Sequence, residues 1–243
     1  MTPLKRLSQC VLFYVLLVHL AAMSLTWNMV ALVLHPVLTR EHGTVVGRAA
    51  VSSVYRSFWT CAQWLGLMRI DSTALDVLER DAGLIIAANH PSMLDALLIV
   101  ARVPRGICIM RSSLMRNPFL GAACRLARYI RNEPPRGMIR SAVANLKAGG
   151  QLVLFPEGTR TVATPVNTFR PGITLMAHMA RVPIQAVIIE TDSPYLGKGW
   201  PIWRAPAFPV VIRVRLGQRF APEADHHGLL KRLEAYFAEE LRG

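Results

Sequence analysis

The strongest constraint on the fold is an alternation, after residue 83, of short apolar runs with segments of helical pattern. The apolar runs have strand length and are rich in β-branched residues; they occupy residues 84–88, 107–110, 152–155, 184–189 and 210–216. Helical patterns lie between or after them, at residues 93–101, 118–128, 137–148, 171–181 and 228–241. Buried strands that alternate with helices predict an α/β fold with a mostly parallel central sheet flanked by helices.

The N-terminal part of the chain has a different character, because no charged residue occurs within residues 7–39. Its core is nearly all apolar, and a stretch of this length can cross a bilayer, which takes about 20 apolar residues. A cleaved signal peptide usually has a shorter apolar region of about 7–15 residues. We therefore expect a membrane segment over residues 1–42, followed by one globular domain over residues 43–243.

The topology of this segment has two alternatives. Polar side chains are costly at mid-bilayer depth, and the apolar stretch contains His19, Ser24, Thr26 and Asn28. An N-terminal membrane helix that spans the bilayer and a re-entrant helical hairpin in one leaflet both remain open. An amphipathic helix with apolar bulk is expected next, over residues 45–68.

The N-terminus and the domain are both expected on the cytoplasmic side of the membrane, which fits a re-entrant hairpin better than a single span. Lys5 and Arg6 precede the apolar stretch, which places the N-terminus in the cytoplasm by the positive-inside rule. The cysteines form neither a Cys-x-x-Cys pair nor a Cys/His cluster; they are Cys10, Cys61, Cys108 and Cys124. This pattern indicates a reducing compartment and no zinc site.

Composition limits the class of partner. The chain is 52% hydrophobic and only 18% charged, which favours membrane contact, and its formal net charge of +13 indicates an anionic partner. Nucleic acid, phospholipid head groups and a phosphorylated substrate would all satisfy that charge. The sequence has no zinc-finger spacing, helix-turn-helix or aromatic-rich RNA motif, and a nucleic-acid-binding module rarely carries so long an uncharged segment. A nucleic-acid partner is therefore not expected.

A histidine and an aspartate stand close together after the first predicted strand. His90 ends that strand, and Asp95 lies in the first turn of the next predicted helix. The turn between them can fold back, so that the carboxylate holds one imidazole nitrogen as N–H and leaves the other as a base. The structural alternative is that His90 caps a helix and Asp95 interacts with the helix dipole.

No nucleophile accompanies this pair. The sequence has no Gly-x-Ser-x-Gly elbow, and Ser92 lies within the loop rather than at a sharp strand-to-helix turn. A base without a protein nucleophile suits a reaction in which the substrate provides the hydroxyl; His90 takes its proton as it attacks an activated carbonyl such as a thioester. A membrane-anchored lipid esterase is the alternative, with Ser92 as its candidate nucleophile.

A second polar cluster follows the predicted strand at residues 152–155. Residues 155–161, Phe-Pro-Glu-Gly-Thr-Arg-Thr, place a glycine-containing turn, a hydroxyl and an arginine beyond the strand end. Backbone N–H groups and a guanidinium can hold a phosphate there. An ordinary turn with an ion pair between Arg160 and Glu157 is the structural alternative. Both clusters follow strands, where ligands of open α/β sheets bind.

Two segments of the sequence resemble the conserved boxes of a known family. Asn89-His90-Pro91-Ser92-Met93-Leu94-Asp95 resembles the N-H-x-S-x-x-D box, and residues 155–161 the F-P-E-G-T-R-S box, of the glycerolipid acyltransferases, which include 1-acylglycerol-3-phosphate acyltransferase. Residues 168–172 resemble the family's F-K-x-G element, and residues 182–187 its V-P-I-x-P-V strand, with alanine in place of the second proline.

This resemblance implies acyl transfer from acyl-CoA or acyl carrier protein to the free hydroxyl of a lysolipid, foremost 1-acylglycerol-3-phosphate, at a phospholipid membrane. It implies His90 as general base and Asp95 as its orienting partner. The acceptor site would be lined by Glu157, Gly158, Thr159 and Arg160. No metal, cofactor or covalent enzyme intermediate is required, because the thioester is a co-substrate.

One box departs from the family pattern. The family has G-x-x-F-I-x-R, whose arginine binds the acceptor's phosphate, whereas residues 126–132 lack the glycine and place Asn132 at the arginine position. Arg131 and Arg128 are the candidate substitutes. Otherwise the acceptor is a different molecule, such as another lysophospholipid, a lyso-amino-acid lipid or a specialised metabolite.

The region between Asp95 and Glu133 contains no acidic residue but many arginines, which are Arg102, Arg105, Arg111, Arg116, Arg125, Arg128 and Arg131. A solvated basic face would account for some of them. The others would attract anionic lipid, at about 1 kcal/mol per basic residue near the surface. The same surface would attract acyl carrier protein, which is acidic, or the phosphates of CoA.

Overall fold

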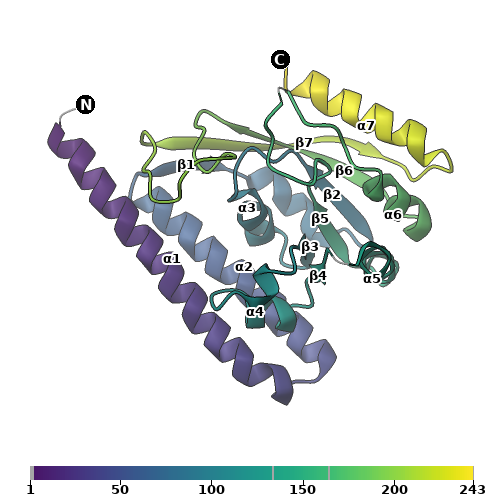
Figure 1. Cartoon of the computed structure of the whole chain (residues 1–243), viewed down its shortest axis with the longest axis horizontal. Coiled ribbons are helices and arrows are strands. Elements are labelled where there is room, and N and C mark those ends of the chain that lie inside the picture. The colour runs from purple at the N-terminus through teal and green to yellow at the C-terminus, as the bar shows by residue number, and fades with distance from the viewer. Residues whose placement is uncertain (1–2, 133, 164, 243) are drawn as a thin grey trace.

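The computed structural model describes residues 3–132, 134–163 and 165–242, which form an α/β fold around a seven-stranded sheet (Figure 1). The strands are β1 (Met68–Asp71), β2 (Leu84–Ala88), β3 (Gly106–Met110), β4 (Ile130–Arg131), β5 (Gln151–Leu154), β6 (Ile184–Thr191) and β7 (Val210–Phe220). Their order is β1-β7-β6-β2-β5-β3-β4, and every neighbouring pair is parallel except β6 and β7. The predicted mostly parallel sheet is confirmed.

Helices cover both faces of the sheet. The helices are α1 (Pro3–Val37), α2 (Arg40–Trp64), α3 (Asp95–Arg102), α4 (Gly121–Leu126), α5 (Pro135–Lys147), α6 (Gly172–Ala180) and α7 (His226–Glu240), with 3-10 turns at Thr73–Arg80 and Leu114–Arg116. One core cluster packs α1, α2, α3 and α4 against one face of the sheet. A second cluster packs α5, α6 and α7 against the other face. Strand β2 serves both, because Ile86 and Ile85 point to opposite faces.

The predicted strands and helices all occur, with ends shifted by a few residues, but two strands were missed. β1 reads Met-Arg-Ile-Asp and alternates between buried and exposed side chains at the sheet edge, so it has no continuous apolar run. β4 comprises only two residues. Edge strands such as these carry a weaker sequence signal than strands buried on both faces.

The N-terminal segment forms one half of a helical hairpin with α2. Helix α1 is continuous over 35 residues and is the one helix in the described part of the chain that is long and apolar enough to cross a membrane. Its inner face packs on α2 and α4. Asn28, which would be costly in lipid, is buried here: its Oδ1 accepts the N–H groups of Ala122 (2.8 Å) and Ala123 (3.1 Å) at the start of α4.

The outer face of α1 carries exposed apolar side chains along its whole length. They recur every three or four residues and include Leu4, Leu7, Val11, Val15, Val18, Leu25, Met29 and Val33. Beside its N-terminal half lie the exposed Ile202 and Trp203, whose loop is tied to α1 by a hydrogen bond from the Tyr14 hydroxyl to the Trp203 carbonyl (2.7 Å). These side chains form one apolar strip on the outside of the molecule.

Candidate active site

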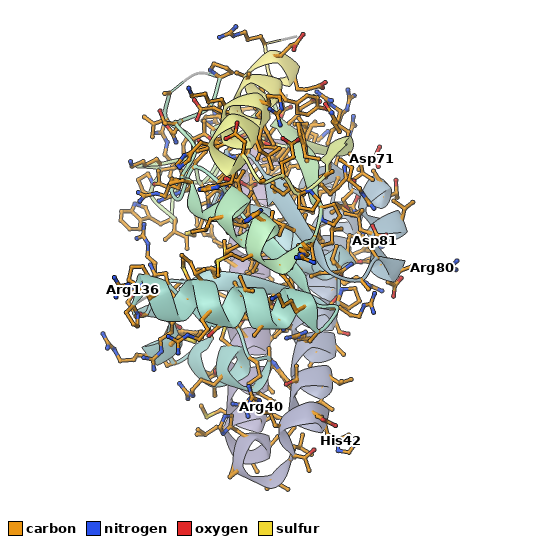
Figure 2. All side chains as sticks on the ribbon, turned by 90° about the vertical axis from the view of Figure 1, so that its right-hand side faces the viewer. Arg40, His42, Asp71, Arg80, Asp81 and Arg136 are labelled. Atoms are coloured by element: carbon orange, nitrogen blue, oxygen red, sulfur yellow. The ribbon has the colours of Figure 1, made fainter. Side chains whose placement is uncertain are left out.

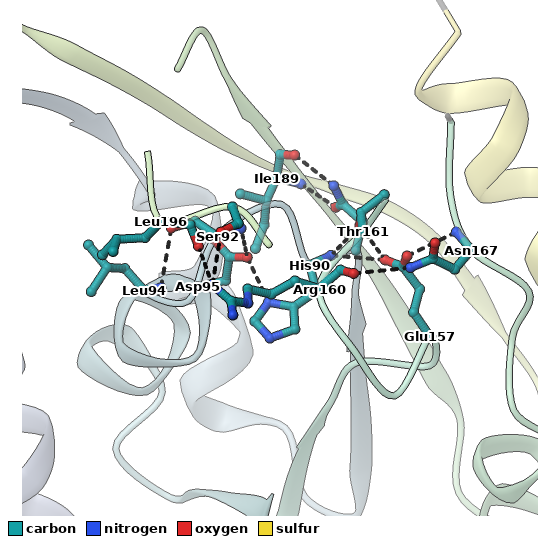
Figure 3. Close-up of polar contacts among 12 residues, drawn as sticks. His90, Ser92, Leu94, Asp95, Glu157, Arg160, Thr161, Asn167, Ile189 and Leu196 are labelled. Atoms are coloured by element: carbon teal, nitrogen blue, oxygen red, sulfur yellow. Dashed lines mark hydrogen bonds and ion pairs between the residues drawn. The ribbon is translucent and has the colours of Figure 1, made fainter. Parts of the chain in front are cut away.

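His90 and Asp95 meet beyond the carboxyl end of β2 (Figure 3). His90 follows the strand, and Asp95 is the first residue of α3, so the loop between them turns back on itself. His90 Nδ1 lies 2.9 Å from Asp95 Oδ2, and the same oxygen accepts the Ser92 backbone N–H at 2.8 Å. The carboxylate therefore fixes the Nδ1 proton and leaves Nε2 as the free nitrogen of the ring.

The surroundings fix the plane of the imidazole. The Phe155 ring stacks on it, with centroids 3.9 Å apart and planes inclined by 17°. The His90 side chain is 17% exposed and that of Asp95 only 3%, so a substrate can reach the histidine but not its partner. Burial raises the pKa of the Asp95 carboxyl, and the bonds from His90 and the Ser92 backbone act against that shift.

Glu157 joins the two sequence clusters. Its Oε1 accepts the His90 backbone N–H (3.1 Å) and the Thr161 hydroxyl (2.6 Å), and its Oε2 accepts the Asn167 backbone N–H (2.9 Å). The Thr161 N–H in turn donates to the His90 carbonyl at 2.8 Å. Glu157 is only 3% exposed. Its carboxylate thus holds the His90 backbone in place, and the ion pair with Arg160 that the structural alternative would require does not occur among the described residues.

Asn89 fixes the end of β2 from the other side. Its side-chain amide donates to the Ile189 carbonyl (2.8 Å), and its Oδ1 accepts the Ile189 N–H (2.7 Å), so it continues the β2–β6 ladder by one side chain. Asn89 belongs to the sequence box that contains His90, but the sequence predicted no role for Asn89. The available sequence signal was its place as the first residue of the box that resembles N-H-x-S-x-x-D.

The other predicted residues of the second cluster lie in the loop after β5. Gly158 has φ +69°, a left-handed conformation that favours glycine. Thr159 is half-buried beside it. Arg160 Nη1 donates to the carbonyls of Leu196 and Gly197, both at 2.9 Å, and so ties this loop to the β6–β7 connection. That tie was not predicted, because it joins residues far apart in the sequence.

Arg128 and Arg131 do not join this cluster. Arg128 precedes β4 and Arg131 is its last residue, and both line a separate groove with Arg125 and Arg140 at the edge of the sheet. Asn132, at the position of the family's arginine, closes the β3–β4 connection: its Oδ1 accepts the Ser112 N–H at 3.3 Å. Within the described ranges, no group of three or more His, Cys, Asp or Glu side chains is placed to hold a metal ion.

A histidine at a strand end, paired with a buried carboxylate, thus lies at the carboxyl edge of a mostly parallel sheet, where α/β proteins bind their ligands. The family model described as Acyltransferase matches residues 69–190. The chain belongs to this acyltransferase family.

Curated relatives agree with this assignment. A lysophosphatidylcholine acyltransferase of Drosophila melanogaster is 30% identical over 52% of this chain and 24% of its own length. A 1-acyl-sn-glycerol-3-phosphate acyltransferase of Cocos nucifera is 30% identical over 43% of this chain and 36% of its own length. The chain thus spans about a quarter to a third of these relatives.

Two bacterial proteins match over nearly the whole chain. A 1-acyl-sn-glycerol-3-phosphate acyltransferase of Pseudomonas aeruginosa is 24% identical over 95% of this chain and 89% of its own length. The crystal structure of the 1-acyl-sn-glycerophosphate acyltransferase PlsC from Thermotoga maritima superposes with a TM-score of 0.71, covering 100% of this chain and 97% of that one at 22% identity. This likeness shows that the two proteins share a fold, the N-terminal helices included.

Proposed function

We propose that this protein transfers a fatty acyl group from a thioester donor to the free hydroxyl of a lysolipid, foremost 1-acylglycerol-3-phosphate. The observation that carries the proposal is the contact of 2.9 Å between His90 Nδ1 and Asp95 Oδ2, which leaves Nε2 free beside a surface that a substrate can reach. The names of the curated relatives support the class of acceptor.

In the proposed reaction, His90 Nε2 takes the proton of the acceptor hydroxyl as its oxygen attacks the thioester carbonyl. The carbon–oxygen bond forms, and collapse of the tetrahedral intermediate breaks the carbon–sulfur bond. The imidazolium returns the proton to the departing thiolate. Asp95 stabilises the imidazolium by its hydrogen bond to Nδ1 and keeps Nε2 directed at the substrate. The donor is acyl-CoA or acyl carrier protein.

Arg160 is the proposed contact for the acceptor's phosphate. In the described part of the chain only its Nη1 has hydrogen-bond partners, so the rest of the guanidinium can pair with an anion. Its bonds to the β6–β7 connection hold it next to the His90 loop, because the Leu196 carbonyl also accepts the Met93 N–H at 3.0 Å. Gly158 and Thr159 would line the same acceptor site.

We also propose that the protein lies on one leaflet of the membrane, with its catalytic domain in the cytoplasm. The apolar strip of α1 faces outward, while its other side packs lengthwise on α2 and α4. If α1 crossed the bilayer, the polar surfaces of those neighbours would enter the hydrocarbon region at high cost. A helix lying in the interface, with Trp203 at head-group depth, avoids that cost.

The decisive experiment offers the purified protein a labelled acyl-CoA or acyl carrier protein and a panel of lysolipids in mixed micelles. We expect a diacyl product that His90→Ala abolishes and that Asp95→Ala nearly abolishes. The matched control is His227→Ala, since His227 is exposed at the start of α7. Turnover by His90→Ala at the wild-type rate would refute the assignment, and release of free fatty acid without a lipid product would indicate an esterase.

Membrane association is tested separately by flotation with lipid vesicles. Replacing Val11, Val15 and Val18 by serine removes apolar side chains that are 54%, 58% and 68% exposed, and should release the protein from vesicles. The same change on the exposed Val77, which lies on the 3-10 turn before β2, should leave binding unchanged. Equal flotation of the triple variant and the wild type would exclude α1 as the membrane contact.

A further inference from the structure

A large groove lies at the free edge of the sheet, outside β4. This β4-edge groove has a volume of about 810 Å³. The basic residues that line it are His35, Arg40, Arg125, Arg128, Arg131 and Arg140. In Figure 2, Arg136 marks the start of α5, and Arg40 lies below that helix, near the turn of the α1–α2 hairpin.

No acidic side chain among the described lining residues neutralises the arginines of the groove. In the part of the chain that the structure describes, which leaves out Glu133, the groove lining contains no aspartate or glutamate. The Arg125 guanidinium donates to the Met115 carbonyl at 2.7 Å. The side chains of Arg40, Arg128, Arg131 and Arg140 have no hydrogen bond or ion pair with a described residue. Guanidinium groups gathered in this way suit a ligand with several negative charges.

The groove and His90 are separated by three strand positions in the sheet. Strand pairing places Arg131 level with Ala88, with β5 and β3 between β2 and β4. Three strand spacings separate the two backbones by about 14 Å. In 1-acylglycerol-3-phosphate only a few bonds separate the free hydroxyl from the phosphate. The backbone separation is much larger than that short span, so the groove suits a phosphate that lies farther from the reacting atoms.

The other substrate of the proposed reaction does match the groove. The nucleotide end of an acyl-CoA carries a diphosphate and a ribose 3′-phosphate, and a long, flexible pantetheine arm separates these charges from the thioester. The groove begins at the carboxyl edge of the sheet, where Arg131 ends β4, and extends along α5 as far as Ala148. The arm could therefore cross the ends of β3 and β5 to reach His90.

We infer that the β4-edge groove binds the phosphates of the nucleotide end of an acyl-CoA donor, through Arg40, Arg128, Arg131 and Arg140. This rests on the proposed function only in taking an acyl thioester as the donor. Planar guanidinium groups pair with phosphate oxygens in bidentate fashion, which gives the groove a selectivity for phosphate over simple anions. Arg128 and Arg131, first considered for the acceptor, then act on the donor.

The test measures binding without turnover. Adenosine 3′,5′-bisphosphate, the soluble nucleotide portion of CoA, is titrated into the full-length protein in a neutral detergent and followed by calorimetry. We expect the double variant Arg131→Gln/Arg140→Gln to weaken this binding by at least about tenfold, since each lost charged hydrogen bond is worth about that factor. The double variant Arg69→Gln/Arg80→Gln removes the same charge from exposed sites at the opposite sheet edge and should bind normally.

The kinetic arm separates the two substrates. For Arg131→Gln/Arg140→Gln we expect the KM for acyl-CoA to rise about tenfold or more while the KM for the lysolipid stays unchanged. Equal binding of the bisphosphate by both double variants, or a rise confined to the lysolipid KM, would overturn the inference. So would normal use of acyl-CoA with impaired use of acyl carrier protein, because the groove would then serve a protein donor.

The inference and the proposed function can fail independently. His90→Ala should keep wild-type affinity for the bisphosphate, because His90 does not line the groove. If the wild-type protein binds the bisphosphate but transfers no acyl group, the nucleotide site stands and the proposed reaction falls. If it transfers acyl groups but the groove variants bind the bisphosphate normally, the reaction stands and the groove assignment falls.

Discussion

Replacing Asn89 by alanine should destabilise the protein, although Asn89 contacts no substrate in the proposed reaction. The side chain makes two hydrogen bonds to the backbone of Ile189, at 2.8 Å and 2.7 Å. Asn89 is 4% exposed and Ile189 2%, so bulk water cannot replace the lost bonds directly. Asn89→Ala leaves one buried N–H group and one buried carbonyl without their partner.

The size of the effect follows from those two groups. Each buried polar group left unpaired costs about 1–3 kcal/mol, so the two together cost about 2–6 kcal/mol. An ordered water in the space vacated by the amide would recover part of the loss. We therefore expect the free energy of unfolding to fall by about 3 kcal/mol. For a chain of this size that corresponds to a Tm lower by about 6–12 °C.

The assay is denaturant unfolding of wild type and variant in the same detergent, together with kcat and KM. Asn117→Ala is the control, since Asn117 Oδ1 accepts a single, exposed hydrogen bond from the Phe119 N–H; it should cost less than about 1 kcal/mol. Because His90 follows Asn89, kcat should fall as well while both KM values stay unchanged. A loss below about 1 kcal/mol for Asn89→Ala would refute the reasoning.

Three further predictions concern the same site. Burial raises the pKa of the Asp95 carboxyl in the folded protein. Protonated Asp95 therefore stabilises the folded state below the ordinary carboxyl pKa of about 3.9. This stabilisation is lost as the pH rises through the raised pKa of the folded state. The unfolding free energy of wild type minus that of Asp95→Asn should decline above about pH 4, and a difference that rises with pH would contradict this. Glu157→Gln should cost about 1–3 kcal/mol and lower kcat, because its amide would present a donor to a backbone N–H such as that of Asn167; an effect on the acceptor KM alone would indicate a substrate contact instead. Gly158→Ala should cost about 1–2 kcal/mol, since φ is +69° and the new Cβ would lie 2.3 Å from Arg170 Nε; unchanged thermal stability would show that the loop relaxes freely.

The central strands were predictable because each is buried on both faces. Such strands read as continuous apolar runs, and β2, β5 and β6 all do. The edge strands β1 and β4 were not predictable, since one is half-exposed and the other has two residues. The antiparallel direction of β7 also lay beyond the sequence, because it depends on the path of the long β6–β7 connection.

The N-terminal segment shows how packing changes the meaning of a composition. The sequence shows that residues 7–39 are apolar enough for a membrane. Asn28 stands against a lipid-exposed helix there, because a polar side chain is costly in the bilayer. In the structure Asn28 binds the start of α4 and the carbonyl of Pro118, so it faces protein. Which side of a long apolar helix meets lipid is decided by which side its own protein covers.

By itself the sequence determined the α/β class and the apolar N-terminus, and it predicted the pairing of His90 with Asp95. These depend on local pattern, since apolar periodicity selects the elements and a short loop brings a strand-end histidine back to the next helix. Only the tertiary structure decided that Glu157 holds the His90 backbone, that Arg160 binds the β6–β7 connection, and that Arg131 lies three strands away from His90. The physical reason is that strand order and loop closure bring together residues far apart in the chain, and local patterns carry no information about that order.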